Sequence, residues 1–145
     1  MLNSGERMFA YAFDGYWKDV GTLDSLWQAN MDLLDDKDIV ELFGNNNDWK
    51  IYSEDTYGFP QFIGANASVE NSIVNQGCNI LGDVKDSVLF SNVTVEEGAK
   101  VKACVVLPGA VIEKGSVIEH AIVGPDMKVS GVHGSMDEKV VLINE

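Results

Sequence analysis

Four short segments of this chain resemble one another and follow at a nearly constant spacing, with successive starts 15, 17 and 17 residues apart. The segments are Ser72-Ile-Val, Ser87-Val-Leu, Cys104-Val-Val and Ala121-Ile-Val. Between them runs a finer step of five or six residues, in which an aliphatic residue opens a short unit that also holds glycine or another small residue. Val95–Lys100 and Ile112–Ser116 show this unit best. A fixed period of this kind indicates stacked structural repeats.

The six-residue step predicts a left-handed parallel β-helix built from hexapeptides. Three short flat strands make one triangular coil, so one aliphatic residue per side points inward and stacks on its equivalent in the next coil. A small residue fits where each side tapers to a corner, and glycine or asparagine tolerates the backbone of the corner itself. The alternative is an antiparallel sandwich, but sandwich strands usually recur every 8–12 residues without a six-residue substructure.

The amino-terminal part of the chain has a different pattern. The aromatic run over residues 8–13 is consistent with a strand, and residues 16–20 fit a second short strand. Thr22 is a plausible helix N-cap, followed by an almost continuous apolar stripe that predicts a helix over residues 22–34. The stripe consists of Leu23, Leu26, Trp27, Met31 and Leu34, with Asn30 as its one polar member.

These patterns divide the chain into three parts. Two short strands and one helix cannot bury an independent core, so we expect residues 1–36 to be the last elements of a catalytic domain, with Trp27 and Met31 in the core of that domain. Residues 37–60 are expected to be a linker, because they contain turn-rich polar clusters around a short extended piece at Trp49–Tyr52. Residues 61–145 are expected to form the β-helix, with Lys139–Ile143 as a last strand or an arm.

Several of these motifs resemble one known family. The run from Phe13 to Leu34 contains Gly15-Tyr-Trp-Lys-Asp-Val-Gly-Thr22, which is similar to the end of the catalytic domain in bacterial glucose-1-phosphate adenylyltransferases, also called ADP-glucose pyrophosphorylases. Trp49–Tyr52, Asn71–Val74, Asp86–Phe90 and Val106–Ala110 resemble the β-helix that follows in that family. The similarity covers roughly residues 8–143.

The resemblance implies an activity and a metal ligand. Enzymes of this family join ATP and glucose 1-phosphate, release pyrophosphate and make ADP-glucose for glycogen, with Mg²⁺ offsetting phosphate charge during in-line attack. The acidic residue of the Tyr-Trp-x-Asp motif, Asp19 here, would help to hold Mg²⁺. The alternative for Asp19 is a solvated turn residue or a hydrogen-bond acceptor at the start of the helix. Tyr16 and Trp17 are expected to pack in a core rather than to contact a ligand.

The same comparison shows what this sequence lacks. It contains neither the glycine-rich nucleotide loop of the family, Gly-x-Gly-x-x-x-Arg, nor a P-loop. The second metal-binding aspartate and the sugar-phosphate lysines are expected upstream, so no complete catalytic set is present and the chain alone is expected to be inactive. The resemblance also implies a tetramer, either a homo-oligomer or one with related subunits, and a cleft for small anionic regulators.

Composition limits the partners and the compartment. The formal net charge of −13 disfavours binding to nucleic acid or to anionic membranes. No apolar run is long enough to span a bilayer, and the polar start does not resemble an export signal. Only two cysteines occur, Cys78 and Cys104, and both are expected to be reduced core or corner residues. We therefore expect a cytoplasmic protein.

Two alternative functions remain open from the sequence. A hexapeptide acyltransferase would need a histidine general base, for which only His120 and His133 are available. His120 is expected to be an outward strand residue, and His133 a loop residue in a glycine-flanked turn. The second alternative is a non-catalytic β-helix that serves assembly or regulation, because the open ends of a β-helix favour coverage by a partner. Retention of the motif around Asp19 favours the catalytic type of subunit.

Overall fold

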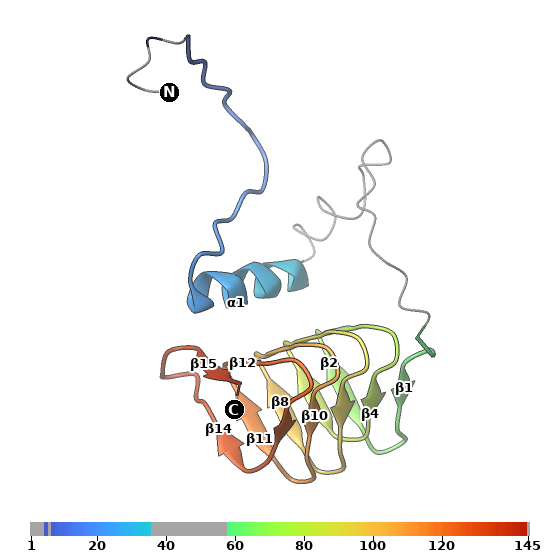
Figure 1. Ribbon diagram of the computed structural model, residues 1–145. Coiled ribbons are helices and arrows are strands. Elements are labelled where there is room, and N and C mark those ends of the chain that lie inside the picture. The colour runs from blue at the N-terminus through green and yellow to red at the C-terminus, as the bar shows by residue number, and fades with distance from the viewer. Residues whose placement is uncertain (1–4, 6, 36–57, 145) are drawn as a thin grey trace.

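Three parallel sheets dominate the computed structural model, which describes residues 5, 7–35 and 58–144. Successive strands along the chain go to different sheets, and every third strand pairs in parallel with the one a full coil earlier. The described part of the chain therefore winds as a parallel β-helix of about five coils (Figure 1). This confirms the predicted fold class.

Each sheet takes one strand from every coil. The first sheet consists of β1 (Phe62–Ile63), β4 (Asn79–Ile80), β7 (Thr94–Val95), β10 (Val111–Ile112) and β13 (Lys128–Val129). The second consists of β2 (Ser68–Glu70), β5 (Asp83–Lys85), β8 (Lys100–Lys102), β11 (Val117–Glu119) and β14 (Val132–His133). The third consists of β3 (Ile73–Val74), β6 (Val88–Leu89), β9 (Val105–Val106), β12 (Ala121–Val123) and β15 (Val141–Ile143).

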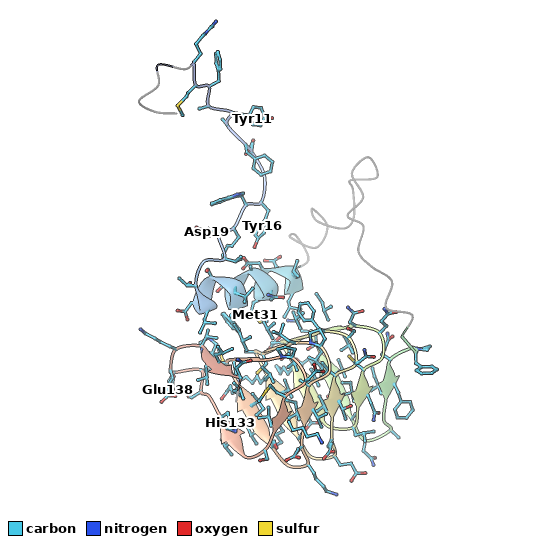
Figure 2. The ribbon with its side chains drawn as sticks, viewed as in Figure 1. Tyr11, Tyr16, Asp19, Met31, His133 and Glu138 are labelled. Carbon is cyan, nitrogen blue, oxygen red and sulfur yellow. The ribbon has the colours of Figure 1, made fainter. Side chains whose placement is uncertain are left out.

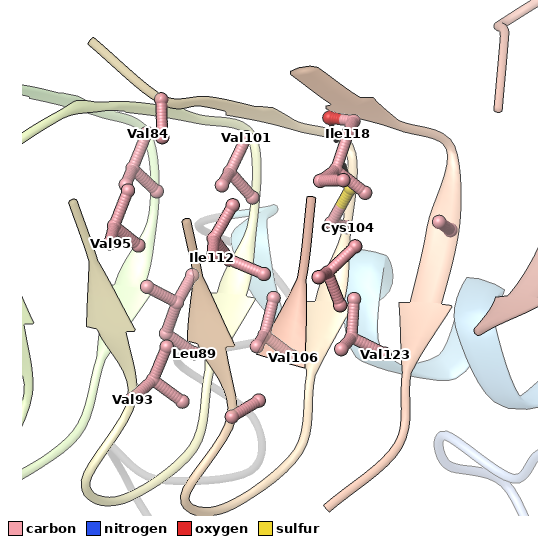
Figure 3. Packing of buried hydrophobic residues seen from close by; sticks show 14 of the residues in the cluster. Val84, Leu89, Val93, Val95, Val101, Cys104, Val106, Ile112, Ile118 and Val123 are labelled. Carbon is pink, nitrogen blue, oxygen red and sulfur yellow. Dashed lines mark hydrogen bonds between the residues drawn. The ribbon is translucent and has the colours of Figure 1, made fainter. Parts of the chain in front are cut away.

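Aliphatic side chains fill the interior of the β-helix in register. In the first sheet, for example, Ile80 pairs with Val95 and Val95 with Ile112, and all three are fully buried. Equivalent columns run through the other two sheets, and Figure 3 shows the three columns meeting along the axis. A fully buried valine or isoleucine stabilises the folded state by about 1.5–3 kcal/mol, so this repeated column is the main source of stability.

The coils turn at corners that require unusual backbone angles. One corner recurs with positive φ at Asn71, Asp86, Ala103 and His120, with φ between 42° and 51°. Asparagine and aspartate tolerate this left-handed conformation better than most residues, which explains two of the four. Next to this corner, the Ser87 hydroxyl donates to the Lys85 carbonyl oxygen at 2.7 Å and accepts from the Cys104 amide at 3.1 Å.

The predicted helix is present before the β-helix. It consists of α1 (Leu23–Met31), which continues as the 3-10 helix η1 (Asp32–Leu34). Thr22 caps α1 as predicted: its side chain accepts from the Ser25 amide at 3.2 Å, and the Ser25 hydroxyl accepts from the Thr22 amide at 3.0 Å.

The two strands predicted over residues 8–13 and 16–20 are wrong. Both stretches lie in the described part of the chain and have no regular secondary structure. An isolated alternating segment is not stable as a strand unless a neighbouring strand forms hydrogen bonds with its backbone. None of the described strands pairs with residues 8–13 or 16–20. The extended piece predicted at Trp49–Tyr52 lies outside the described residues. The tail does form a strand, because β15 pairs with β12.

Candidate functional site

Asp19, the predicted metal ligand, lies in the exposed segment that leads into α1 (Figure 2). One carboxylate oxygen, Oδ1, accepts a hydrogen bond from the Gly21 amide at 3.2 Å. The alternative interpretation of Asp19, as an acceptor close to the helix start, thus describes one of its two oxygens. Thr22, the residue after Gly21, is the N-cap of α1. The backbone is therefore held on the carboxyl side of Asp19.

A second set of contacts holds the backbone on the amino side of Asp19. Asp32, at the end of α1, accepts hydrogen bonds from the Tyr16 hydroxyl at 2.9 Å and from the Lys18 ammonium at 3.0 Å. The Gln28 amide donates to the other Asp32 oxygen at 2.8 Å. The sequence analysis did not identify Asp32, because two of its three partners lie 14 and 16 residues away and no local pattern connects these to it.

Helix α1 packs on the outer face of the third sheet, where Leu26, Trp27 and Met31 contact a cluster that contains Val105 and Ile122. Figure 2 shows Met31 on the side of the helix that faces the β-helix. The prediction that Trp27 and Met31 lie in the core of another domain is therefore wrong. The strands beneath the helix have consecutive apolar residues, so one member of each pair points outward and needs a cover.

Trp27 makes the most specific contact between the helix and the β-helix. Its indole Nε1 donates to the Ala103 carbonyl oxygen at 2.7 Å, and its ring meets the His120 ring edge-on with centroids 4.5 Å apart. Ala103 is one of the corner residues with positive φ. The equivalent corner residues in the coils before and after it are Asp86 and His120, which carry larger side chains.

Comparison with known proteins identifies the family of this chain. A family model described as GlmU-like, C-terminal hexapeptide, matches residues 61–137, which is more than half of the chain. The chain belongs to this hexapeptide family. A second model, described as nucleotidyl transferase, matches residues 1–36, which include Asp19 and α1.

Curated relatives of this hexapeptide chain carry the name glucose-1-phosphate adenylyltransferase. The Bacillus cytotoxicus protein is 51% identical over 149 residues, which cover all of this chain and 39% of that protein. The proteins from Bacillus thuringiensis strain Al Hakam and Bacillus anthracis are each 55% identical over 129 residues, covering 89% of this chain and 34% of theirs. These matches confirm the predicted resemblance. The chain spans less than two fifths of the length of these relatives.

Nucleotidyltransferases generally use a divalent metal, for which Mg²⁺ sets the ligand requirements considered for this hexapeptide chain's carboxylates. The ion takes hard oxygen ligands, keeps several waters and is commonly held by one or two carboxylates together with substrate phosphates. Asp19 fits as one such carboxylate, because it is exposed at the end of a segment. Among the described residues, no three side chains of the metal-binding types cluster into a complete site.

The two histidines of the hexapeptide domain lie elsewhere than expected. His120 is at a corner just after β11, not in a strand, with its side chain partly covered by Trp27 and Nδ1 3.0 Å from the Glu138 carbonyl oxygen. His133 is in strand β14, not in a loop, in register with Ile118 of the preceding coil, and its Nε2 lies 2.8 Å from the Ser130 carbonyl oxygen. Each ring thus has one nitrogen engaged with the backbone.

Both cysteines are unpaired and buried, as predicted. Burial raises the pKa of the Cys104 thiol to about 12 and also raises the pKa of the Cys78 thiol. Their sulfurs donate to backbone carbonyl oxygens, Cys104 to Lys102 and Cys78 to Phe90, each at 3.0 Å. Thiols with raised pKa values and no exposure are poor nucleophiles and poor metal ligands.

One surface hollow lies beside the first coils and is lined by Phe62, Gly64, Ala65, Asn66, Leu81, Glu97 and Gly98. Among its described lining residues only Glu97 is charged, and this carboxylate is paired with Lys114 at 3.1 Å, so the lining has no cationic side chain for a phosphate group. The hollow is therefore a poor site for a nucleotide or a sugar phosphate. No helix in the described residues is both long and apolar enough to cross a membrane.

Proposed function

We propose that this chain is the carboxy-terminal part of an enzyme that forms ADP-glucose and pyrophosphate from ATP and glucose 1-phosphate, for glycogen synthesis. The observation that carries the proposal is the arrangement of the segment around Asp19. The nucleotidyl transferase match includes α1, and α1 is packed on a hexapeptide β-helix within the same chain. The relatives that carry the adenylyltransferase name match across both parts.

In this proposal Asp19 supplies one carboxylate oxygen to Mg²⁺. The ion, when bound, offsets the negative charge of the reacting phosphates and orients them for in-line attack. The protein contributes an exposed carboxylate on a backbone segment held on both sides, by Gly21 and Thr22 after it and by Asp32 before it. The remaining catalytic groups are absent from this sequence, so the chain alone is expected to be inactive.

The β-helix would serve assembly and regulation in the same enzyme. Its first coil exposes Phe62 and Ile63, and its last coil exposes Val132 and Leu142. Exposed apolar side chains at unpaired sheet edges favour contact with another subunit, which supports a homo-oligomer or a tetramer. Two unpaired cysteines suit a reducing compartment, so the proposal places the enzyme in the cytoplasm.

A hybrid enzyme tests the activity. This chain replaces the matching 39% of the Bacillus cytotoxicus relative, and pyrophosphate release is measured with ATP, glucose 1-phosphate and Mg²⁺. We expect activity in the hybrid, none in the chain alone, and a loss of at least about 100-fold with Asp19→Asn. Asp24→Asn, an acidic residue in the first turn of α1, is the matched control and is expected to keep its activity.

The outcomes separate the assignments. An active hybrid that is insensitive to Asp19→Asn would remove the metal-ligand role. An inactive hybrid that folds and assembles would favour a β-helix with a purely structural or regulatory role.

A further inference from the structure

The carboxylate of Asp32 gathers three donors that come from two different segments. Tyr16 and Lys18 reach it from the segment before Asp19, at 2.9 and 3.0 Å, and both use the same oxygen, Oδ2. Gln28, one turn earlier on α1, donates to Oδ1 at 2.8 Å. Every one of these donors is a side chain, so the cluster ties an irregular segment to the end of a helix.

This ion pair differs from the others in the described residues by its burial. The Lys18 and Asp32 side chains are 31% and 19% exposed. Each of the three pairs on the β-helix, such as Lys114 with Glu97, has at least one side chain that is nearly half exposed or more. Burial raises the pKa of Asp32, but the hydrogen bonds from Gln28, Lys18 and Tyr16 outweigh this effect, so its pKa lies below the usual range.

The cluster also marks where contact with the helix begins. Side chains from Met8 to Gly15 are exposed, and Tyr16 is the first residue of this segment whose side chain is partly buried. Only Asp19 and Val20 lie between Lys18, which Asp32 holds, and Gly21, which hydrogen-bonds to Asp19 itself. A displacement of Tyr16 and Lys18 would therefore move Asp19, because so short a stretch of backbone cannot absorb it.

We propose that Asp32 is a positioning residue, which fixes the Tyr16–Lys18 segment on α1 and thereby sets the location of the Asp19 carboxylate. This inference rests on the proposed metal-binding role of Asp19. It also assigns Lys18 to the support of the site, since its ammonium is engaged by Asp32. Asp32 touches neither the metal nor the substrate in this proposal.

Trypsin provides a test that needs no activity, because Lys18 must leave Asp32 to enter the acidic specificity pocket of the protease. The 145-residue chain is digested, and cutting after Lys18 is compared with cutting after the exposed Arg7. We expect Asp32→Asn to speed the cut after Lys18 about tenfold, while the cut after Arg7 is unchanged. Glu97→Gln, which removes a 3.1 Å ion pair on the β-helix, is the matched control and leaves both rates unchanged.

The hybrid enzyme tests the effect on Asp19. We expect Asp32→Asn to raise the Mg²⁺ concentration for half-maximal activity about tenfold, while KM for ATP changes less than about twofold. Asp32→Glu keeps the charge and should restore part of the Mg²⁺ affinity. Tyr16→Phe removes one donor and keeps the ion pair, so it should shift the Mg²⁺ requirement in the same direction by less.

Two results would overturn the proposal in distinguishable ways. If Asp19→Asn abolishes activity but Asp32→Asn leaves both the Mg²⁺ requirement and the tryptic cut unchanged, Asp32 has no positioning role and the proposed function stands. If Asp19→Asn itself has no effect, the metal assignment fails, and the role of Asp32 fails with it.

Discussion

Individual side chains in this chain act over long sequence distances. Asp32 holds residues 14 and 16 positions earlier, and the indole of Trp27 reaches a carbonyl oxygen 76 positions later. The Asp32 contacts lie within the part that matches the nucleotidyl transferase model, and the Trp27 contact joins that part to the β-helix. Within the described residues, Asp19 is therefore held through a short series of contacts.

The lowered pKa of Asp32 predicts how this support responds to pH. A carboxyl group whose pKa is lower in the folded than in the unfolded state stabilises the fold above its unfolded pKa of about 3.9, and this contribution is lost as pH falls through the folded pKa. Asp32→Asn should therefore weaken the attachment of the Tyr16–Lys18 segment to α1 at pH 7. The difference in stability between the Asp32→Asn variant and the unchanged chain should shrink below about pH 4.

Fluorescence of Trp17, which lies between Tyr16 and Lys18, measures this during urea titration, in a chain where Trp27 and Trp49 are replaced by phenylalanine. The control is Glu97→Gln, whose ion pair is mostly exposed and should contribute little at any pH. A deficit for Asp32→Asn that stays constant from pH 7 to pH 3 would contradict a role for the charged carboxylate.

The helix and the strands depend on one another through the outer face of the third sheet. Val105 and Ile122 are 1% exposed although they point away from the interior column, because α1 covers them. Their neighbours Val106 and Val123 fill the interior. A sheet that is apolar on both faces needs a layer on each side, as in sheets covered by helices.

Trp27 tests the strength of this docking. Trp27→Ala removes an indole that is packed on the β-helix and the hydrogen bond to Ala103, so we expect the docking of α1 to weaken by about 3 kcal/mol. Trp27→Phe keeps an aromatic ring and loses only the N–H donor, with an expected cost of about 1 kcal/mol. Far-UV circular dichroism during urea unfolding should then show helix loss before strand loss in the alanine variant. A single coincident transition in that variant would indicate that α1 and the β-helix cannot separate.

The close stacking of coils leads to a prediction about Gly82. A Cβ added there would lie 2.4 Å from the Ala99 carbonyl oxygen and 2.7 Å from that of Glu96, both of which are backbone atoms of the next coil. Gly82→Ala should therefore destabilise the fold by about 3 kcal/mol, at the upper end of the range for overpacking. Gly115 is the matched control, since its φ is +72° but no atom lies within 4 Å of an added Cβ. Its replacement by alanine should cost about 1 kcal/mol from backbone strain alone, as measured by thermal unfolding.

The sequence predicted an element correctly where the stabilising contacts lie within a repeated pattern, and failed where they depend on another segment. The inward columns and α1 were predictable, because the period of six and the helical stripe each reflect burial within one element. The strand predicted at residues 8–13 does not form, because alternation reports a preference that only a partner strand can satisfy. Adjacent apolar pairs such as Val105–Val106 place one apolar side chain on the outer face of the strand, which indicates that another element covers that face. The sequence analysis did not use this signal. Asp32 carried no signal, since its contacts depend on how two segments fold back on each other.

The molecule as a whole is a stack in which neighbouring coils supply most of the stability. Each coil contacts chiefly the coil before and the coil after it, so a central coil has two supporting neighbours and an end coil has one. The cover provided by α1 lies over Val105, Ile122 and Val140, which belong to the later coils. The first coil is instead exposed, with Phe59 at 87% and Ile63 at 48% of their accessible surface. Stability should therefore fall toward β1.

Ile63 and Ile112 test this gradient, because they occupy equivalent positions in the same column of the first sheet. Ile112 is fully buried between two coils, so Ile112→Ala should cost about 4 kcal/mol and speed amide hydrogen exchange across the whole β-helix. Ile63→Ala removes a side chain that is already half exposed, so it should cost about 1 kcal/mol and speed exchange in β1–β3 only. Exchange measured by mass spectrometry on peptides from each coil distinguishes local from global opening. If Ile63→Ala accelerated exchange equally in all five coils, the β-helix would unfold as one cooperative unit. The predicted fall in stability toward β1 would then be wrong.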